Sequence, residues 1–127
     1  MNEHKVQSIL KLSKEERYGY FVDKIVDFEK VWGLNNDGWA ILGDQENSTV
    51  MPFWPEEHFA ERCISEEWKG YKPQAISLQD FLDKWLPGME KDNRLVAVFY
   101  FPELKENIII SPQELKSAIQ EGQKEYL

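Results

Sequence analysis

The residues best able to do chemistry gather in one short segment, residues 55–63, with the sequence PEEHFAERC. His58 and Glu61 stand three positions apart, so on a helix they are neighbours and could share a metal ion. A single histidine beside carboxylates is a common arrangement on an acidic protein, so we expect no metal site. An enzyme that uses His58 and nearby glutamates is the third of the three functions that we consider.

A nucleophilic cysteine would need a histidine base beside it. Cys63 lies five positions after His58, which places the two side chains about 140° apart around a helix. Cys63 also falls on the apolar stripe of its segment, which favours a buried structural thiol. The acidic pairs, such as Glu56 and Glu57, stand at helix ends, where capping and the helix dipole explain them. We therefore predict no catalytic residue.

Phosphate-binding loops need clustered glycines before a helix. The seven glycines of this chain are scattered, and no two stand in a Gly-x-Gly arrangement. Nucleotide binding by that route is excluded, and we expect no cofactor.

The composition is that of one globular domain. The chain has 127 residues, of which 42% are apolar and 13% aromatic, and its net charge is −8. The acidic residues are spread along the chain, which disfavours contact with nucleic acid and with anionic membranes. We expect the partner to be another protein, for which a basic surface would be complementary. The chain itself is expected to be a monomer or a weak homodimer.

The sequence also favours a cytoplasmic location. Cys63 is the one cysteine, so no intramolecular disulfide can form. The first ten residues, MNEHKVQSIL, do not resemble a signal peptide. The longest apolar run, Leu95–Phe101, is far shorter than a membrane span.

Periodicity and turn residues predict where the elements lie. Helices are expected at residues 3–12, 14–29, 55–68, 77–86 and 112–121. Pro87-Gly88 and Gly122 are expected to end the last two helices. Strands are expected at 31–34, 39–42, 49–53, 95–101 and 108–110, and residues 71–76 form an edge strand or an extended connector.

These elements predict one α+β domain over residues 1–127, in which the first 12 residues or so form a peripheral helix. The sheet is expected to have about five mainly antiparallel strands, packed by four to five helices. Residues 31–53 form a hairpin and meander, in which Asn35–Gly38 make the first turn. The apolar segment 95–101 is the central strand, covered on both faces.

Aromatic residues are more numerous than a domain of this size requires, with five tryptophans among them. Most should lie in the core, but Trp54 and Tyr71 fall at element ends, where an exposed ring fits. Such rings are typical of protein interfaces. Together with Asp37, Glu56 and Glu57 they predict an acidic, aromatic patch that binds another protein.

The order of several motifs resembles a known family. VWGLNNDGWAILGD, MPFWPEEHFAERC, ISLQDFLDKWLPGM, LVAVFYFPE and IIISPQEL follow one another along the chain. They are similar to a bacterial family of small acidic proteins, the domain of unknown function numbered 2750, over about residues 20–120. That family is uncharacterised, so the resemblance implies no activity. The spacing of elements also resembles the N-terminal domain of the enhanced-serine-sensitivity protein family, which implies a binding module or a relative of immunity proteins.

Three functions follow, in order. The first is a non-enzymatic module that binds another protein. The second is an immunity or inhibitor protein whose acidic surface steers toward a basic toxin such as a nuclease. The third is the enzyme that uses His58. A free strand edge near Pro73 would permit a homodimer.

Overall fold

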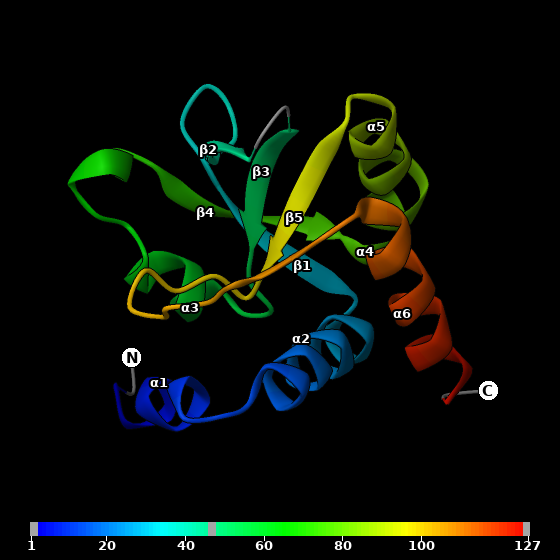
Figure 1. Cartoon of the computed structure of the whole chain (residues 1–127), viewed down its shortest axis with the longest axis horizontal. Helices are drawn as coiled ribbons and strands as arrows, with labels where there is room; N and C mark the ends of the chain where they lie inside the picture. The colour runs from blue at the N-terminus through cyan, green and yellow to red at the C-terminus, as the bar shows by residue number, and fades with distance from the viewer. Residues whose placement is uncertain (1–2, 46–47, 126–127) are drawn as a thin grey trace.

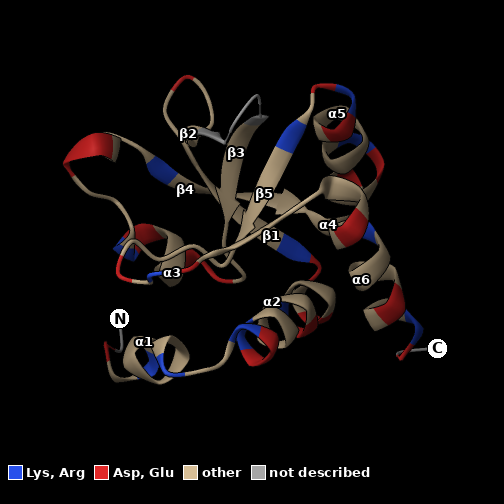
Figure 2. Cartoon of the chain, in the orientation of Figure 1, with Lys and Arg blue, Asp and Glu red and all other residues tan. Residues whose placement is uncertain are grey.

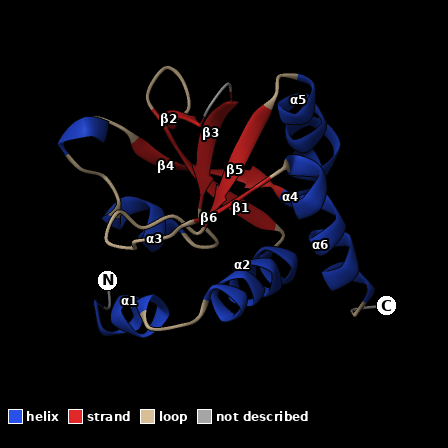
Figure 3. Ribbon diagram, viewed as in Figure 1, coloured by secondary structure: helices blue, strands red, loops and turns tan. Residues whose placement is uncertain are grey.

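The computed structural model describes residues 3–45 and 48–125 and has an α+β fold (Figures 1 and 3). The helices are α1 (Glu3–Leu10), α2 (Lys14–Phe28), α3 (Glu57–Arg62), η1 (Glu66–Trp68), α4 (Leu78–Asp80), η2 (Phe81–Trp85), α5 (Leu86–Lys91) and α6 (Pro112–Lys124). The strands are β1 (Lys30–Asn35), β2 (Leu42–Gln45), β3 (Ser48–Phe53), β4 (Lys72–Ser77), β5 (Arg94–Val98) and β6 (Ile108–Ile110). None of the helices within the described residues is long and apolar enough to cross a membrane.

The strands form two sheets, so the expected single sheet of about five strands is wrong. β1 and β4 make an antiparallel pair, and a second sheet has the order β2-β3-β5-β6. β3 and β5 run parallel, whereas β2–β3 and β5–β6 are antiparallel. The second sheet is therefore mixed. The prediction that the segment around Pro73 lies at a sheet edge is confirmed, because within residues 3–45 and 48–125 β4 pairs with β1 alone.

The expected hairpin between residues 31–34 and 39–42 is also wrong. Only an isolated bridge joins Asn35 to Trp39, and β4 pairs with β1 along its whole length. The ring of Trp39 explains why the chain turns away: it lies on Gly33, where a Cβ would come within 2.9 Å of the ring, and it meets Trp85 edge-on at 4.7 Å. The turn itself has the expected backbone, with positive φ at Asp37 and Gly38.

The apolar segment 95–101 supplies the central strand, as predicted, but the strand is shorter than expected. Val96 and Val98 of β5 are fully buried between β3 and β6. The strand ends at Val98, because Phe99 adopts a left-handed backbone with φ 54°. The backbone N–H of Phe99 then donates to the carbonyl of Phe53 at 2.9 Å. Phe101 beyond it is still fully buried, so its apolar character reflects the core and not the sheet.

Helix starts agree well with the local signals. Ser13 and Glu16 form a full capping box at the start of α2. Ser77 and Ser111 cap α4 and α6 through their hydroxyl groups, which accept from the backbone N–H three residues later. These contacts depend only on residues close in sequence.

Two helix ends differ from the prediction. The helix after Ser77 does not stop at Pro87, because the π-helical turn η2 comes just before it and Leu86 N–H donates to the carbonyl of Phe81. In a regular helix a proline lacks the N–H for one hydrogen bond, and its ring clashes with the carbonyl four residues earlier. The wider π-helical turn relieves both problems, so α5 continues to Lys91. Gly122 likewise lies inside α6 and does not end it.

The segment after Pro55 is the third difference. α3 begins at Glu57, has no side-chain cap, and ends at Arg62 instead of continuing to Trp68. The first residue of this helix is therefore Glu57, and Glu56 is its N-cap. The short helix η1 follows as a separate turn.

One hydrophobic cluster gathers the buried side chains of both sheets and of the helices from α1 to α6. α1 lies at the edge of the fold in Figure 1, yet its Val6 and Ile9 belong to this cluster. α2 and α6 flank the sheets and contact each other near their C-terminal ends, where Gly122 meets Val22 and Val26. Two surface hollows are lined by residues of these two helices.

Candidate protein-binding face

The expected exposed ring of Trp54 is wrong, because Trp54 is fully buried. Its indole N–H donates to the backbone carbonyl of Tyr100 at 2.7 Å. Its ring meets that of Trp68 edge-on at 6.4 Å. Trp54 also exchanges two backbone hydrogen bonds with Trp32, at 2.8 and 2.9 Å, and so joins β1 to the end of β3. Its role in this structure is architectural.

The other four residues of the expected patch differ in their exposure. Tyr71 is half-buried against the core, whereas Asp37 and Glu57 are exposed. Asp37 lies in the loop after β1, and Glu57 is the first residue of α3. Glu56 faces α1 and α2, so its carboxylate is committed within the molecule.

Glu56 is the centre of a polar cluster at the junction of α1, α2 and α3. Its carboxylate accepts hydrogen bonds from Lys5 Nζ at 3.1 Å and from the Tyr20 hydroxyl at 3.0 Å, and it lies 3.5 Å from His58 Nε2. Burial, followed by the Glu56 carboxylate, raises the pKa of Tyr20. Burial alone would lower the pKa of Lys5, but its contacts with Glu56 and Tyr20 raise it overall. The cluster ties three helices together.

The residues considered for catalysis are separated. His58 packs on the Phe59 ring at 4.1 Å and faces Glu56, whereas Glu61 is exposed. Burial lowers the pKa of His58, although the Glu56 charge acts in the opposite direction. Cys63 is buried, as predicted, and burial raises the pKa of its thiol to about 12. Within residues 3–45 and 48–125, no group of three potential ligands is placed to hold a metal ion.

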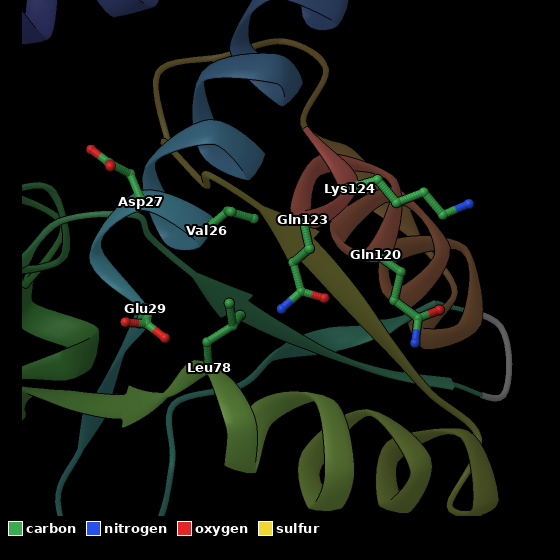
Figure 4. A pocket seen from close by; sticks show the side chains of 7 residues that line it. All are labelled: Val26, Asp27, Glu29, Leu78, Gln120, Gln123 and Lys124. Carbon is green, nitrogen blue, oxygen red and sulfur yellow. The ribbon is translucent and has the colours of Figure 1, made fainter. Parts of the chain in front are cut away.

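Two hollows lie on either side of the contact between α2 and α6. One, of about 630 Å³, is shown in Figure 4. We call it the α2–α4–α6 cavity, and its lining is Val26, Asp27, Glu29, Leu78, Gln120, Gln123 and Lys124.

The lining of this cavity divides into two groups in Figure 4. Val26, Leu78 and Gln123 point toward one another across the opening, whereas Asp27 and Lys124 point away from it. Val26 and Leu78 are almost completely buried, so they form a firm apolar floor. The volume lies in the range that holds small ligands.

The second hollow, of about 610 Å³, is the one that we call the α2–α6 groove. α2 contributes Glu15, Tyr18, Gly19, Val22 and Asp23. α6 contributes Ala118, Glu121, Gly122, Lys124 and Glu125. The spacing on α2 is i, i+3, i+4, i+7 and i+8, which is one continuous face of a helix. On α6 residues 118, 121, 122 and 125 repeat that spacing, so two matching faces meet in the groove.

The rim of the groove is acidic and its floor is apolar. Glu15 and Asp23 line the α2 side, and Glu121 and Glu125 line the α6 side. Lys124 is the basic residue of the lining, and its Nζ lies 3.3 Å from the Glu121 carboxylate. Four carboxylates therefore face one partly neutralised ammonium group. Figure 2 shows acidic residues on both helices.

The floor consists of Tyr18, Val22 and Ala118 together with two glycines. Gly122 packs closely on α2, because a Cβ there would come within 3.0 Å of Val22 Cγ1. Gly19 is different: a Cβ at that position would meet no atom within 4 Å. On its α6 side the groove is therefore closely packed, because Gly122 lies against Val22, whereas the space above Gly19 is open.

Sequence reasoning missed this site. It placed a helix at residues 14–29 and treated the acidic residues as spread along the chain. The available signal was the repeat of acidic, small and apolar residues at helical spacing in Glu15–Asp23. Nothing in the sequence indicated that α6 would lie beside that face.

The geometry can be set beside known proteins. A family model described as "Protein of unknown function (DUF2750)" matches residues 18–119, which is most of the chain. The chain belongs to the DUF2750 family. The resemblance stated from the motifs is therefore confirmed. No curated protein matches the chain.

The match to the DUF2750 family includes both sheets and half of the residues that line the groove, and Gly122 lies outside it. It begins at Tyr18 and ends at Ile119. Gly19, Val22, Asp23 and Ala118 of the groove lie inside the match, whereas Glu121 and Glu125 lie beyond it.

Proposed function

We propose that this member of the DUF2750 family is a cytoplasmic, non-enzymatic module that binds another protein through the α2–α6 groove. The observation that carries the proposal is the groove itself, in which four carboxylates surround an apolar floor. An apolar floor supplies affinity through burial of surface, and charges around it steer and select a partner of opposite sign. The partner is therefore expected to present basic side chains around an apolar centre.

The immunity or inhibitor hypothesis is a special case of this proposal. A basic toxin, such as a nuclease, carries the kind of surface that the groove complements, and electrostatic steering would speed its capture. Such a complex should form quickly at low salt and more slowly as the salt concentration rises.

A charge reversal tests the proposal. Asp23→Lys with Glu125→Lys removes half of the acidic rim without breaking any ion pair given above, and lysine at the end of α6 complements the helix dipole. The matched control is Glu66→Lys with Glu67→Lys on η1, which lies on the opposite side of the molecule from α6 in Figure 2. Both variants carry the same net charge.

The measurement is affinity capture from native lysate with the wild-type chain and both variants as bait, read by quantitative mass spectrometry. We expect a basic protein that is retained by the wild type and the control, lost with the groove variant, and eluted by salt. Equal retention of every captured protein by both variants would count against the groove as the binding site.

The α2–α4–α6 cavity favours a second candidate function, the binding of a small molecule. Its volume and its convergent Val26, Leu78 and Gln123 are features of ligand pockets. A Leu78→Trp variant would fill the opening. A fragment library followed by NMR should give hits whose shifts centre on Leu78 and disappear in that variant, and an absence of hits would remove this candidate.

A further inference from the structure

Gly19 is placed where a glycine gives the isolated chain no benefit. It lies in the interior of α2, where glycine is less stable than alanine because it loses more backbone freedom on folding. Its backbone does not have the positive φ that favours glycine. A Cβ there would meet no atom within 4 Å, so no packing inside the molecule excludes a side chain.

Gly19 also lies at the centre of the α2 side of the groove. Glu15 precedes it by one turn and Asp23 follows it by one turn, and all three line the same hollow. Glycine in such a place allows the backbone of another chain to approach closely. Nearby, Tyr18 and Val22 provide the apolar contacts that would border such an approach.

The dimensions of the groove suit a helix. The segment Glu15–Asp23 rises by eight residues, which is about 12 Å along the α2 axis. Residues 118–125 give about 10 Å along α6. Each length corresponds to about two helical turns of an occupant that lies along it. An amphipathic helix that lays its apolar face in a groove is a recurring mode of protein recognition.

From these observations we propose that the occupant of the α2–α6 groove is an amphipathic α-helix of a partner protein, with small residues over Gly19 and basic residues on its flanks. This inference rests on the proposed function and adds the form of the partner. Lysines or arginines two turns apart on one flank would reach Glu15 and Asp23, and those one turn apart on the other flank would reach Glu121 and Glu125. A second copy of this chain is not the occupant, because its rim would oppose carboxylates to carboxylates.

Three synthetic helical peptides serve as probes. The first has alanines along its seam, the central row of contact residues, with lysines two turns apart on one flank and lysines one turn apart on the other. The second replaces the lysines with glutamates, and the third replaces the seam alanines with leucines. Each is titrated into the ¹⁵N-labelled full chain at low salt and followed by NMR, and affinity is measured by fluorescence anisotropy.

We expect the lysine–alanine peptide to bind with amide shifts confined to residues 15–23 and 118–125. Gly19→Leu should weaken that binding about tenfold or more, since a side chain would block the seam. Gly19→Ala should raise the melting temperature, because alanine has a higher helix propensity than glycine. The same variant should still weaken peptide binding. The leucine-seam peptide should bind less tightly, and the glutamate peptide should not bind.

The matched controls are Gly88→Ala and Gly88→Leu. Gly88 lies in α5, a Cβ there also meets nothing within 4 Å, and it is outside the groove. These variants should leave peptide affinity unchanged within about twofold. If Gly19→Leu loses peptide binding and the Gly88 variants do not, the loss is due to the blocked contact at Gly19 and not to a change in folding.

The possible failures are distinct. One outcome is that the lysine peptide binds the groove, that Asp23→Lys with Glu125→Lys abolishes this binding, and that Gly19→Leu does not change its affinity. In that case the proposed helix contact at Gly19 is wrong, and the acidic groove is still the binding site. If no lysine peptide binds, or the shifts lie elsewhere, both proposals fail. Self-association of the chain through residues 15–23 would likewise overturn the helix of a partner as the occupant.

Discussion

Gly122 of α6 lies against Val22 of α2 so closely that a Cβ at position 122 would come within 3.0 Å of Val22 Cγ1. A second methyl group, Val26 Cγ2, lies 3.5 Å from the same point. This contact fixes how near the two helices approach. It thereby sets the width of both the α2–α6 groove and the α2–α4–α6 cavity.

A leucine at position 122 should therefore be destabilising. Gly122→Leu must push α6 away from Val22, and we expect it to lower the free energy of unfolding by about 1–3 kcal/mol. Urea denaturation measures the change. The control is Gly19→Leu, the same substitution in open space, which should leave stability equal or slightly higher. Equal effects at the two positions would contradict the close packing of α2 and α6.

Trp54 provides a second prediction. Trp54→Phe removes the N–H that donates to the carbonyl of Tyr100 and leaves a void beside Trp68. We expect a loss of about 2–3 kcal/mol in the free energy of unfolding, from the unpaired carbonyl and the cavity together. Trp32→Phe is the control, because Trp32 is only partly buried. A smaller loss for Trp54→Phe than for the control would argue against its buried position.

The polar cluster around Glu56 predicts a local effect on α1. Glu56→Gln removes the charge that holds Lys5 and Tyr20, and we expect a loss of about 1 kcal/mol, since Lys5 is partly exposed. Amide hydrogen exchange in residues 3–10 should accelerate more than in α6. The control is Glu57→Gln, an exposed neighbour that should change little. Uniform acceleration throughout the chain would show that Glu56 does not specifically anchor α1.

Cys63 predicts how stability depends on alkaline pH. Burial raises the pKa of the Cys63 thiol from its usual 9 to about 12, so the unfolded chain releases this proton first as the pH rises. The contribution of the neutral thiol is fully present below pH 9 and is lost between pH 9 and about 12. Within that window the slope is about 1.4 kcal/mol per pH unit. At pH 10 the loss is therefore about 1.4 kcal/mol.

The variant Cys63→Ala isolates this contribution. Urea titrations of wild type and variant at pH 8, 9 and 10 should show a steeper decline for the wild type. The comparison uses slopes, because the loss of the thiol changes packing equally at every pH. Parallel declines would mean that the thiol ionises as readily in the folded chain as in the unfolded one.

Sequence reasoning succeeded where the cause is local. The hydroxyl groups of Ser13, Ser77 and Ser111 cap helices through bonds that span three residues, and all three starts were predicted. The apolar stripe that buries Cys63 follows from helical periodicity alone. The resemblance to the DUF2750 family also followed from the order of short motifs.

Strand pairing could not be read in this way. A turn after β1 makes a local hairpin attractive, but the packing of Trp39 on Gly33 and Trp85 leaves β1 to pair with β4. Pro87 carries a stop signal that the π-helical turn before it removes. In the first case a contact between distant residues outweighs a local preference of roughly 1 kcal/mol, and in the second the shape of the preceding turn decides.

The sequence by itself determined an acidic α+β chain of the DUF2750 family with well-capped helices and one inward thiol. Only the tertiary structure decided that Trp54 is buried and that the acidic faces of α2 and α6 meet. Periodicity indicates which face of a helix is special, but it carries no information about which helix lies beside that face. Residues 15–23 and 118–125 are about a hundred positions apart, and the contact of Gly122 with Val22 brings them together.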